Sequence, residues 1–307
     1  MKKPDLTLKL FASKYWPTWI GLLLLRLLAF IPYSWMKIFS SLFSYLFYNL
    51  AKRRKHIIET NINLCFPEKT DAERCLLSRK AFTSTIMAIF EFSLSWWGRK
   101  KQLTQLHRIE GLEYIEEALK KGKGVILVSS HFTTMEIAGA CLCQHLDNLV
   151  LTYKRSTNEL LDFFIQTQRL EKSAGLIKHK NLREMLRSIK KGNVVWFAPD
   201  QDFGEKDSIF APFMGVETCT LLSTQRIAKL TGAPVITFYG ARIDSESKYV
   251  IRLSPALENF PSGDDRADAS AINHAIEQQI KQAPEQYLWA HRRFKTRPKG
   301  EKGFYTI

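Results

Sequence analysis

The sequence holds few cysteines, and their positions suit neither disulfide bonds nor a metal site. Two of them, Cys141 and Cys143, are too close together for an ordinary structural bridge, and no cluster of cysteine and histidine has the spacing of metal ligands. The total is odd, and the cysteines are Cys65, Cys75, Cys141, Cys143 and Cys219. We therefore expect reduced thiols that act as small buried apolar side chains, and no metal site.

Linkers, internal repeats and nucleic-acid-binding modules are missing as well. No stretch rich in Pro, Gly or Ser interrupts residues 105–297, so one compact domain with an N-terminal appendage is the simplest interpretation. The 45 Lys+Arg against 30 Asp+Glu give a net charge of +15. Such a charge indicates an anionic partner: nucleic acid, an anionic membrane surface, or an acidic protein or substrate. The sequence has no helix-turn-helix, zinc-finger spacing or RNA-binding aromatic signature, which argues against nucleic acid.

No hydrophobic run near the N-terminus reaches the ~20 residues that a membrane-spanning helix needs. The first run, from Trp19 to Ile31, is interrupted by Arg26 and closed by Pro32, and the second, from Trp35 to Leu50, is amphipathic. We expect residues 1–55 to be a membrane anchor that lies in the interface or forms a shallow hairpin. A crossing segment and a buried core helix are the alternatives, and a cleaved signal peptide is not expected, since no small-residue cleavage site follows the first run.

Basic residues on both sides of these runs favour the cytoplasmic side of a membrane for both ends of the anchor. They are Lys2, Lys3, Lys9 and Lys14 before the runs, and Lys52, Arg53, Arg54 and Lys55 after them.

From residue 105 onward, strand-like and helical segments alternate. Residues 125–128 form a continuous apolar run, typical of a strand that is buried on both faces. Further strands are expected at 149–153, 193–198, 234–239 and 249–253, with helices at 158–174, 180–190 and 221–230. This alternation predicts an α/β domain over residues 56–307, with a mixed, mostly parallel sheet flanked by helices. In such sheets, sites lie at the carboxyl ends of the strands.

His131 follows the strand at 125–128 directly, and Glu136 lies five residues further on. If His131 is in the turn and Glu136 in the first turn of the next helix, the two side chains can meet. A neutral imidazole can remove the proton from an attacking alcohol, and a carboxylate on its other ring nitrogen fixes the tautomer. There is no G-x-S-x-G elbow. We therefore predict a pair that activates a substrate hydroxyl, with His131 as general base and Glu136 as its partner.

Four sequence blocks, in order along the chain, resemble a known family. They are SSHFTTME at 129–136, YKRSTNELLD at 153–162, GNVVWFAPDQDFGEKDSIFAPFMG at 192–215 and PEQYLWAHRRFKTRPKGE at 284–301. The chain resembles the late lipid A acyltransferases of Gram-negative bacteria, the lauroyl/myristoyl family that acts on the Kdo-lipid A precursor. The resemblance implies a glycerolipid-acyltransferase-like fold and transfer of a lauroyl-like chain from acyl carrier protein to the hydroxyl of a 3-hydroxyacyl chain. It also implies the cytoplasmic face of the bacterial inner membrane, with no metal or organic cofactor.

The same resemblance assigns residues beyond the His131–Glu136 pair. Arg169 and Asp200 fall where the family has polar residues near the reaction centre, although a helix-surface charge and a turn residue are their respective alternatives. As substrate-binding residues we take Lys154, Asn158, Arg169, Asp200, Arg292 and Arg293. The two C-terminal arginines would contact anions, or else pair with carboxylates at the edge of the core.

Two other functions stay open on the sequence. One is an acyltransferase for another bacterial glycolipid, such as a phosphatidylinositol mannoside, against which the PEQYLWAHRRFKTRP block argues. The other is a basic, membrane-bound nucleic-acid-binding protein, which would need aromatic and basic residues interleaved on a docking surface.

Overall fold

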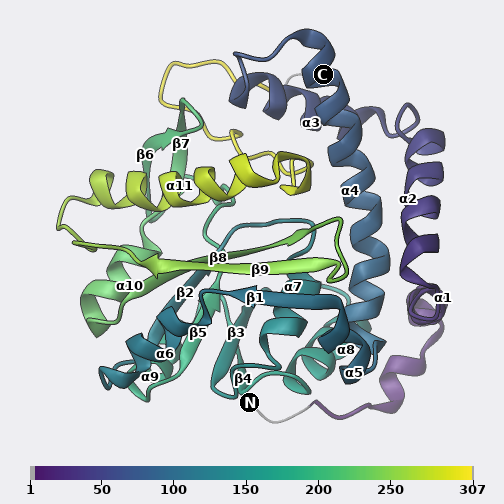
Figure 1. Ribbon diagram of the computed structural model, residues 1–307, viewed down its shortest axis with the longest axis horizontal. Coiled ribbons are helices and arrows are strands. Elements are labelled where there is room, and N and C mark those ends of the chain that lie inside the picture. Colours follow the sequence, from purple (N-terminus) through teal and green to yellow (C-terminus); the bar gives the residue numbers. More distant parts are fainter. Residues whose placement is uncertain (1–3, 306–307) are drawn as a thin grey trace.

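The structure, a computed structural model, describes residues 4–305; Lys2 and Lys3 of the predicted basic flank lie outside them. Within that range seven strands form one sheet in the order β1-β9-β8-β2-β5-β3-β4, with helices on both faces (Figure 1). The strands are β1 (His107–Glu110), β2 (Val125–Ser129), β3 (Leu149–Tyr153), β4 (Gly175–Lys178), β5 (Val194–Phe197), β8 (Val235–Arg242) and β9 (Tyr249–Ala256). A separate antiparallel hairpin consists of β6 (Ser208–Phe213) and β7 (Val216–Leu221).

The strand directions confirm the predicted mixed, mostly parallel sheet. Strand β2 pairs in parallel with β5 and β8, and β3 pairs in parallel with β4 and β5. Only the β8–β9 pairing is antiparallel among the pairs of the seven-stranded sheet in residues 4–305, and β1 runs parallel to β9. Strands β3, β4 and β5, which follow β2 in the sequence, lie on one side of β2 in the sheet, whereas β8 lies on its other side. The carboxyl end of β2 is therefore the switch point where open α/β sheets place their sites.

The continuous apolar run of β2 is explained by helices on both faces of the sheet. Ile126 and Val128 pack in one core cluster with residues of α3, α4 and α11, and Val125 and Leu127 pack in another with α6 and α7. The body helices are α3 (Lys52–Cys65), α4 (Asp71–Trp97), α5 (Lys100–Leu106), α6 (Leu112–Lys120), α7 (Met135–Leu142), α8 (Glu159–Leu170), α9 (Leu182–Lys190), α10 (Ser223–Thr231) and α11 (Asp265–Gln282).

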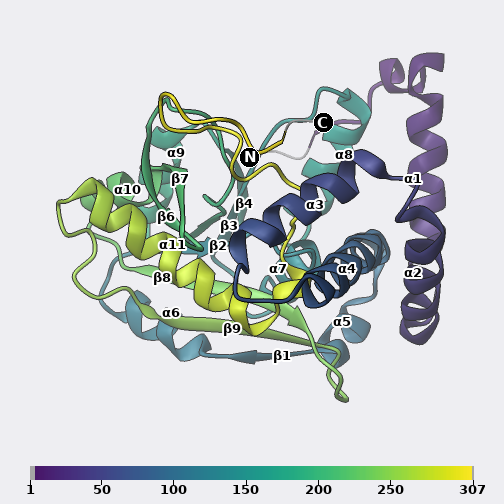
Figure 2. The same ribbon diagram turned by 90° about the horizontal axis from the view of Figure 1, so that it is seen from above.

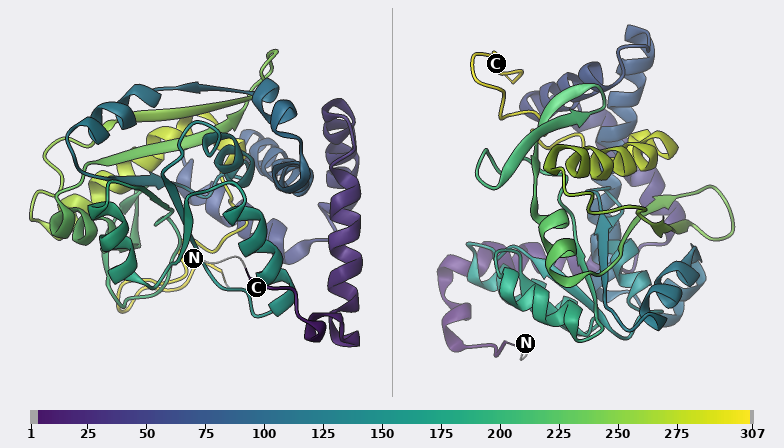
Figure 3. Two further views of the ribbon diagram at one scale, coloured as in Figure 1. Left: turned by 90° about the horizontal axis from the view of Figure 1, so that it is seen from below. Right: turned by 90° about the vertical axis from the view of Figure 1, so that its left-hand side faces the viewer.

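Two further helices, α1 (Trp16–Leu28) and α2 (Tyr33–Phe47), lie outside this body on the side of α4, drawn in purple in Figures 2 and 3. Their outer surface carries large apolar side chains that are half-exposed or more. These include Trp16, Ile20, Leu23, Leu24, Leu27, Trp35, Ile38 and Leu46, and the exposed Phe30 lies in the turn between the two helices. None of the helices in residues 4–305 combines the length and apolar character that crossing a bilayer requires. An interfacial anchor stays a prediction.

Candidate functional site

His131 lies in the turn between β2 and α7, at the predicted edge of the sheet. The C-terminal segment fixes the backbone of this turn. Thr133 N–H donates to the carbonyl oxygen of Gln286 (2.8 Å), and Leu288 N–H donates to the carbonyl oxygen of His131 (2.9 Å). The turn that carries the imidazole is therefore fixed by backbone hydrogen bonds on both sides of Phe132.

The ring of His131 is paired with Asp200, which follows β5, the strand next to β2. Nδ1 of His131 lies 2.5 Å from Oδ1 of Asp200, and the backbone N–H of His131 donates to Oδ2 (2.8 Å). The hydroxyl of Tyr287 also donates to Oδ2 (2.9 Å). Burial raises the pKa of Asp200, but the charge of His131, its two hydrogen bonds and the charge of Arg293 outweigh burial and lower that pKa to about 2. Asp200 is thus a buried, ionised carboxylate on Nδ1.

The predicted contact between His131 and Glu136 is wrong, because the side chain of Glu136 is directed toward α8 and the end of α4. Its carboxylate accepts from Nη2 (2.7 Å) and Nε (3.2 Å) of Arg169 and from Nε1 of Trp96 (3.1 Å). Asp200 occupies the place on Nδ1 that the sequence assigned to Glu136. Burial raises the pKa of Glu136, but the charge and hydrogen bonds of Arg169 and the bond from Trp96 outweigh it, so the pKa is lowered.

A cavity of about 300 Å³ lies beside His131, between α7, α8 and the ends of β3 and β5. Its apolar wall includes Met135, Leu151, Ile165 and Trp196, and both members of the Glu136–Arg169 pair line it. Arg169 therefore lies in the wall of the cavity, as expected for a residue near the reaction centre, and not on an open helix surface. Participation of Glu136 and Arg169 in the reaction stays a prediction.

Lys154 is exposed and lines the mouth of the same cavity, where a substrate-binding residue is expected. Asn158 has a different place, since the cavity lining found within residues 4–305 does not include it. Its side chain caps α8 by accepting from Leu161 N–H (3.0 Å) and donates to Oγ1 of Thr18 (2.8 Å). These contacts give Asn158 a structural role at the start of α8, and its substrate contact stays a prediction.

Arg293 is buried in the core, with 2% of its surface exposed, so the prediction that it contacts a substrate anion is wrong. Its Nη1 donates to the carbonyl oxygen of Cys219 (2.8 Å), and its guanidinium lies over the ring of Phe213 (5.0 Å to the centroid). These partners are also not the core-edge carboxylates of the alternative. Arg292 is half-buried over the ring of Tyr305 (5.7 Å to the centroid), and its anion contact stays a prediction.

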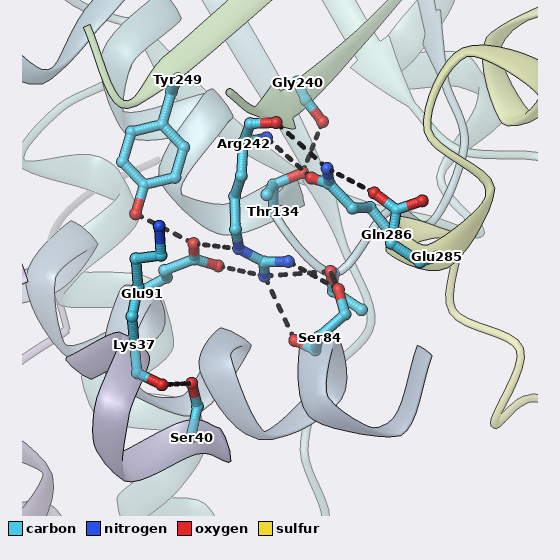
Figure 4. A network of polar contacts seen from close by, with 11 residues as sticks. Lys37, Ser40, Ser84, Glu91, Thr134, Gly240, Arg242, Tyr249, Glu285 and Gln286 are labelled. Atoms are coloured by element: carbon cyan, nitrogen blue, oxygen red, sulfur yellow. Dashed lines mark hydrogen bonds and ion pairs between the residues drawn. The ribbon is translucent and has the colours of Figure 1, made fainter. Parts of the chain in front are cut away.

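A buried network that the sequence did not reveal supports the same turn (Figure 4). Nε and Nη2 of Arg242 donate to the carboxylate of Glu91 at 2.5 and 2.7 Å, and Nη2 also donates to Oγ1 of Thr133 (3.1 Å). Nη1 of Arg242 donates to Oγ of Ser84 (2.6 Å), and the hydroxyl of Tyr249 donates to Glu91 (2.9 Å). Residues of α4, β8 and β9 thereby hold the threonine two positions after His131.

These features define an α/β enzyme in which a histidine, oriented by a buried aspartate at the switch point of the sheet, faces a partly apolar cavity. A model of the family described as bacterial lipid A biosynthesis acyltransferase matches residues 4–296. The chain is 36% identical over 295 residues to the lipid A biosynthesis palmitoleoyltransferase of Escherichia coli K12, covering 95% of each chain. It is 32% identical over 303 residues to the lauroyltransferase of the same organism, covering 98% of this chain and 99% of the relative. The chain belongs to this family and is an acyltransferase.

Proposed function

We propose that the protein transfers a fatty acyl group, lauroyl-like in length, from acyl carrier protein to the hydroxyl of a 3-hydroxyacyl chain on the Kdo-lipid A precursor. The proposed location is the cytoplasmic face of the inner membrane. The observation that carries the proposal is the His131–Asp200 pair beside the cavity. With Nδ1 bound to Asp200, Nε2 is the nitrogen left to take up the proton of an acceptor hydroxyl.

In this reaction the acceptor oxygen attacks the thioester carbonyl carbon, a C–O bond forms and the C–S bond breaks. Nε2 of His131 takes the hydroxyl proton during the attack and gives it to the departing thiol sulfur, so the proton count balances. The charge of Asp200 stabilises the imidazolium between these two steps. The acceptor itself is the nucleophile, so the reaction needs none from the protein.

Two features of the structure support the proposed substrates. The apolar wall of the cavity suits an acyl chain, because such a wall removes its methylene groups from water. At the mouth, Lys154 and Lys180 lie near His179, which stacks on the exposed ring of Phe203 (6.4 Å between centroids). Cations around an exposed apolar side chain suit an acidic carrier protein that delivers its thioester to the mouth.

The apolar outer surface of α1 and α2 supports the membrane part of the proposal. Exposing an apolar face of this kind to water is unfavourable in free energy. Burial at the boundary between the lipid headgroups and acyl chains removes that cost. The acceptor is a membrane lipid under this proposal, so the same face would keep the cavity close to its substrate.

The test is transfer from lauroyl-acyl carrier protein to purified lipid precursor by His131→Ala, with the exposed His274→Ala as matched control. We expect His131→Ala to lower kcat by about 10²–10⁴-fold, the usual contribution of a general base, and the control to keep normal turnover. Turnover within a few-fold of normal in a folded His131→Ala protein would refute the mechanism. Acyl carrier proteins loaded with chains of graded length test the lauroyl preference in the same assay.

A further inference from the structure

The segment from Gln286 to Leu288 is built into the turn that carries His131. Phe132 and Tyr287 form an isolated antiparallel bridge, flanked by the two backbone hydrogen bonds of Thr133 and Leu288. The side chain of Gln286 accepts from Arg242 N–H (2.7 Å) and donates to the carbonyl oxygen of Arg242 (3.1 Å). This segment is therefore anchored to β8 on one side and to the His131 turn on the other.

Within this segment, the side chain of Tyr287 reaches the partner of the base. Its hydroxyl donates to Oδ2 of Asp200, whereas Oδ1 of Asp200 faces Nδ1 of His131. The tyrosine is 4% exposed, and its ring packs edge-on against Phe132 (6.0 Å) and Trp289 (4.8 Å). Because the hydroxyl is enclosed, it cannot replace its hydrogen bond to Asp200 by one to water unless the surrounding core side chains move.

We propose that Tyr287 is a positioning residue that acts through Asp200 and sets the pH at which His131 becomes free to accept a proton. The hydrogen bond to Oδ2 fixes the rotation of the carboxylate, so that Oδ1 points at Nδ1. It also draws negative charge toward Oδ2 and leaves less for the imidazolium. The inference rests on the proposed role of His131 as the base.

The direction of the effect follows from this charge distribution. Without the hydroxyl, Asp200 places more negative charge on the His131 side and stabilises the imidazolium. The imidazole then keeps its second proton to higher pH, and the acidic limb of the kcat/KM profile moves upward. We expect a displacement of about 0.5–1 pH unit for one charge-assisted hydrogen bond.

The displacement of the His131 curve has to be separated from the titration of the groups around the His131–Asp200 pair. Burial holds the pKa of His291 at about 4, so this histidine stays neutral above that pH. Burial raises the pKa of the Cys65 thiol and, with the charge of Asp200, that of Tyr287, so both stay protonated. The other groups that face the pair or line the cavity include the charged side chains Arg293, Lys295, Asp202, Glu136, Lys154, Arg169 and Lys172. Cys143 and Tyr153 also line the cavity, and burial raises the pKa of both. His179 lines it as well, and burial lowers its pKa below the ordinary 6.5, so the NMR signal of His131 itself is needed to separate the two histidines.

The experiment compares the full-length Tyr287→Phe and Tyr305→Phe variants with the parent protein. The hydroxyl of Tyr305 donates to Asn61 and accepts from Phe294 N–H (3.0 Å), so this control loses a half-buried, hydrogen-bonded tyrosine hydroxyl near the C-terminus that does not bind Asp200. We measure kcat/KM from pH 5 to 9 and the protonation of His131 by NMR of histidine-labelled protein. Tyr287→Phe should displace both curves upward, with kcat on the alkaline side within about threefold of normal. Tyr305→Phe should lower Tm and displace neither.

Two results would overturn the inference. One is a Tyr287→Phe protein whose activity and His131 protonation follow the normal curves. The other is equal loss of activity at every pH with a lowered Tm, which describes a purely structural residue. Failure of the proposed function looks different, because His131→Ala would then stay active. The NMR curve needs no turnover, so the contact between Tyr287 and Asp200 is tested in either case.

Discussion

Replacing Asp200 by asparagine is the most informative single change, because the structure dictates how the new amide must lie. Oδ2 accepts from His131 N–H and from the hydroxyl of Tyr287, so the atom at this place must remain an oxygen. The amide nitrogen of Asp200→Asn must then face Nδ1 of His131. A donor at that place turns Nδ1 into an acceptor and moves the ring proton to Nε2, the nitrogen that has to be free.

This argument sets the size of the effect. In a Ser-His-Asp triad the same substitution leaves the geometry intact, gives the wrong tautomer and lowers kcat about 10⁴-fold. We expect Asp200→Asn to lower kcat by about 10³–10⁴-fold, with KM for the lipid within a few-fold of normal, since uniform binding is unaffected. The shape of the side chain is conserved, so the loss belongs to the chemical step.

The assay is steady-state transfer with both substrates varied, alongside thermal melting. Glu136→Gln is the contrasting variant, since it breaks the ion pair with Arg169 and leaves the His131–Asp200 pair intact. We expect it to lower Tm, because it leaves a largely buried guanidinium without its countercharge. The reasoning would be refuted if Asp200→Asn kept more than a tenth of normal kcat while a folded Glu136→Gln enzyme had lost its activity. That result would restore Glu136 as the partner of His131.

Three further predictions concern stability and membrane binding. Glu91→Gln should lower the free energy of unfolding by about 3–5 kcal/mol in denaturant titration, because it leaves the guanidinium of Arg242 buried without its carboxylate; the exposed Glu116→Gln should have little effect. The pKa of Asp200 is lowered to about 2 from an ordinary 3.8, so the ionised carboxylate stabilises the fold above pH 3.8. This stabilisation is lost as the pH falls to 2. It should therefore contribute ~2–3 kcal/mol to acid unfolding that is missing in Asp200→Asn. Leu23→Asn with Leu27→Asn should weaken sedimentation with anionic vesicles about tenfold or more without changing Tm, and unaltered sedimentation would contradict an anchor on α1.

The main strands and helices were predictable because their patterns are local. The apolar run of β2 and the periodic spacing of α8 and α9 appear in any window of the sequence that covers them. Strands β1 and β4 were missed, since HRIE and GLIK are four residues long and carry charged side chains. The β6–β7 hairpin was missed as well, although Met214 and Gly215 at its turn have positive φ of 50° and 78°. The missed strands lack a clear apolar run and are defined by their neighbours in the sheet or hairpin, which a local pattern does not contain.

Without the family resemblance, which also placed Arg169 and Asp200 near the reaction centre, the site was predictable only as far as its first residue. His131 could be placed because a buried strand ends just before it. Its partner could not, because Asp200 is 69 positions away and reaches Nδ1 only through the adjacency of β2 and β5. The choice of Glu136 relied on closeness in sequence, whereas the helix directs that side chain to Arg169. Tyr287 carries no signal of its own, since one tyrosine in an aromatic segment is most simply a core residue.

The buried charges suggest why the site can rely on so few exposed groups. Asp200, Glu136 and Glu91 are each ionised or ion-paired beneath the surface, and each is paired with a group from an element far away in the sequence. Ion pairs of this kind contribute little net stability, because desolvation cancels much of their attraction. They do hold dipoles and charges in place before substrate arrives, so that no reorganisation is needed when the imidazolium forms. Loss of one partner from any pair should therefore cost more than the pair contributes, in stability for Glu91 and Glu136 and in both stability and rate for Asp200.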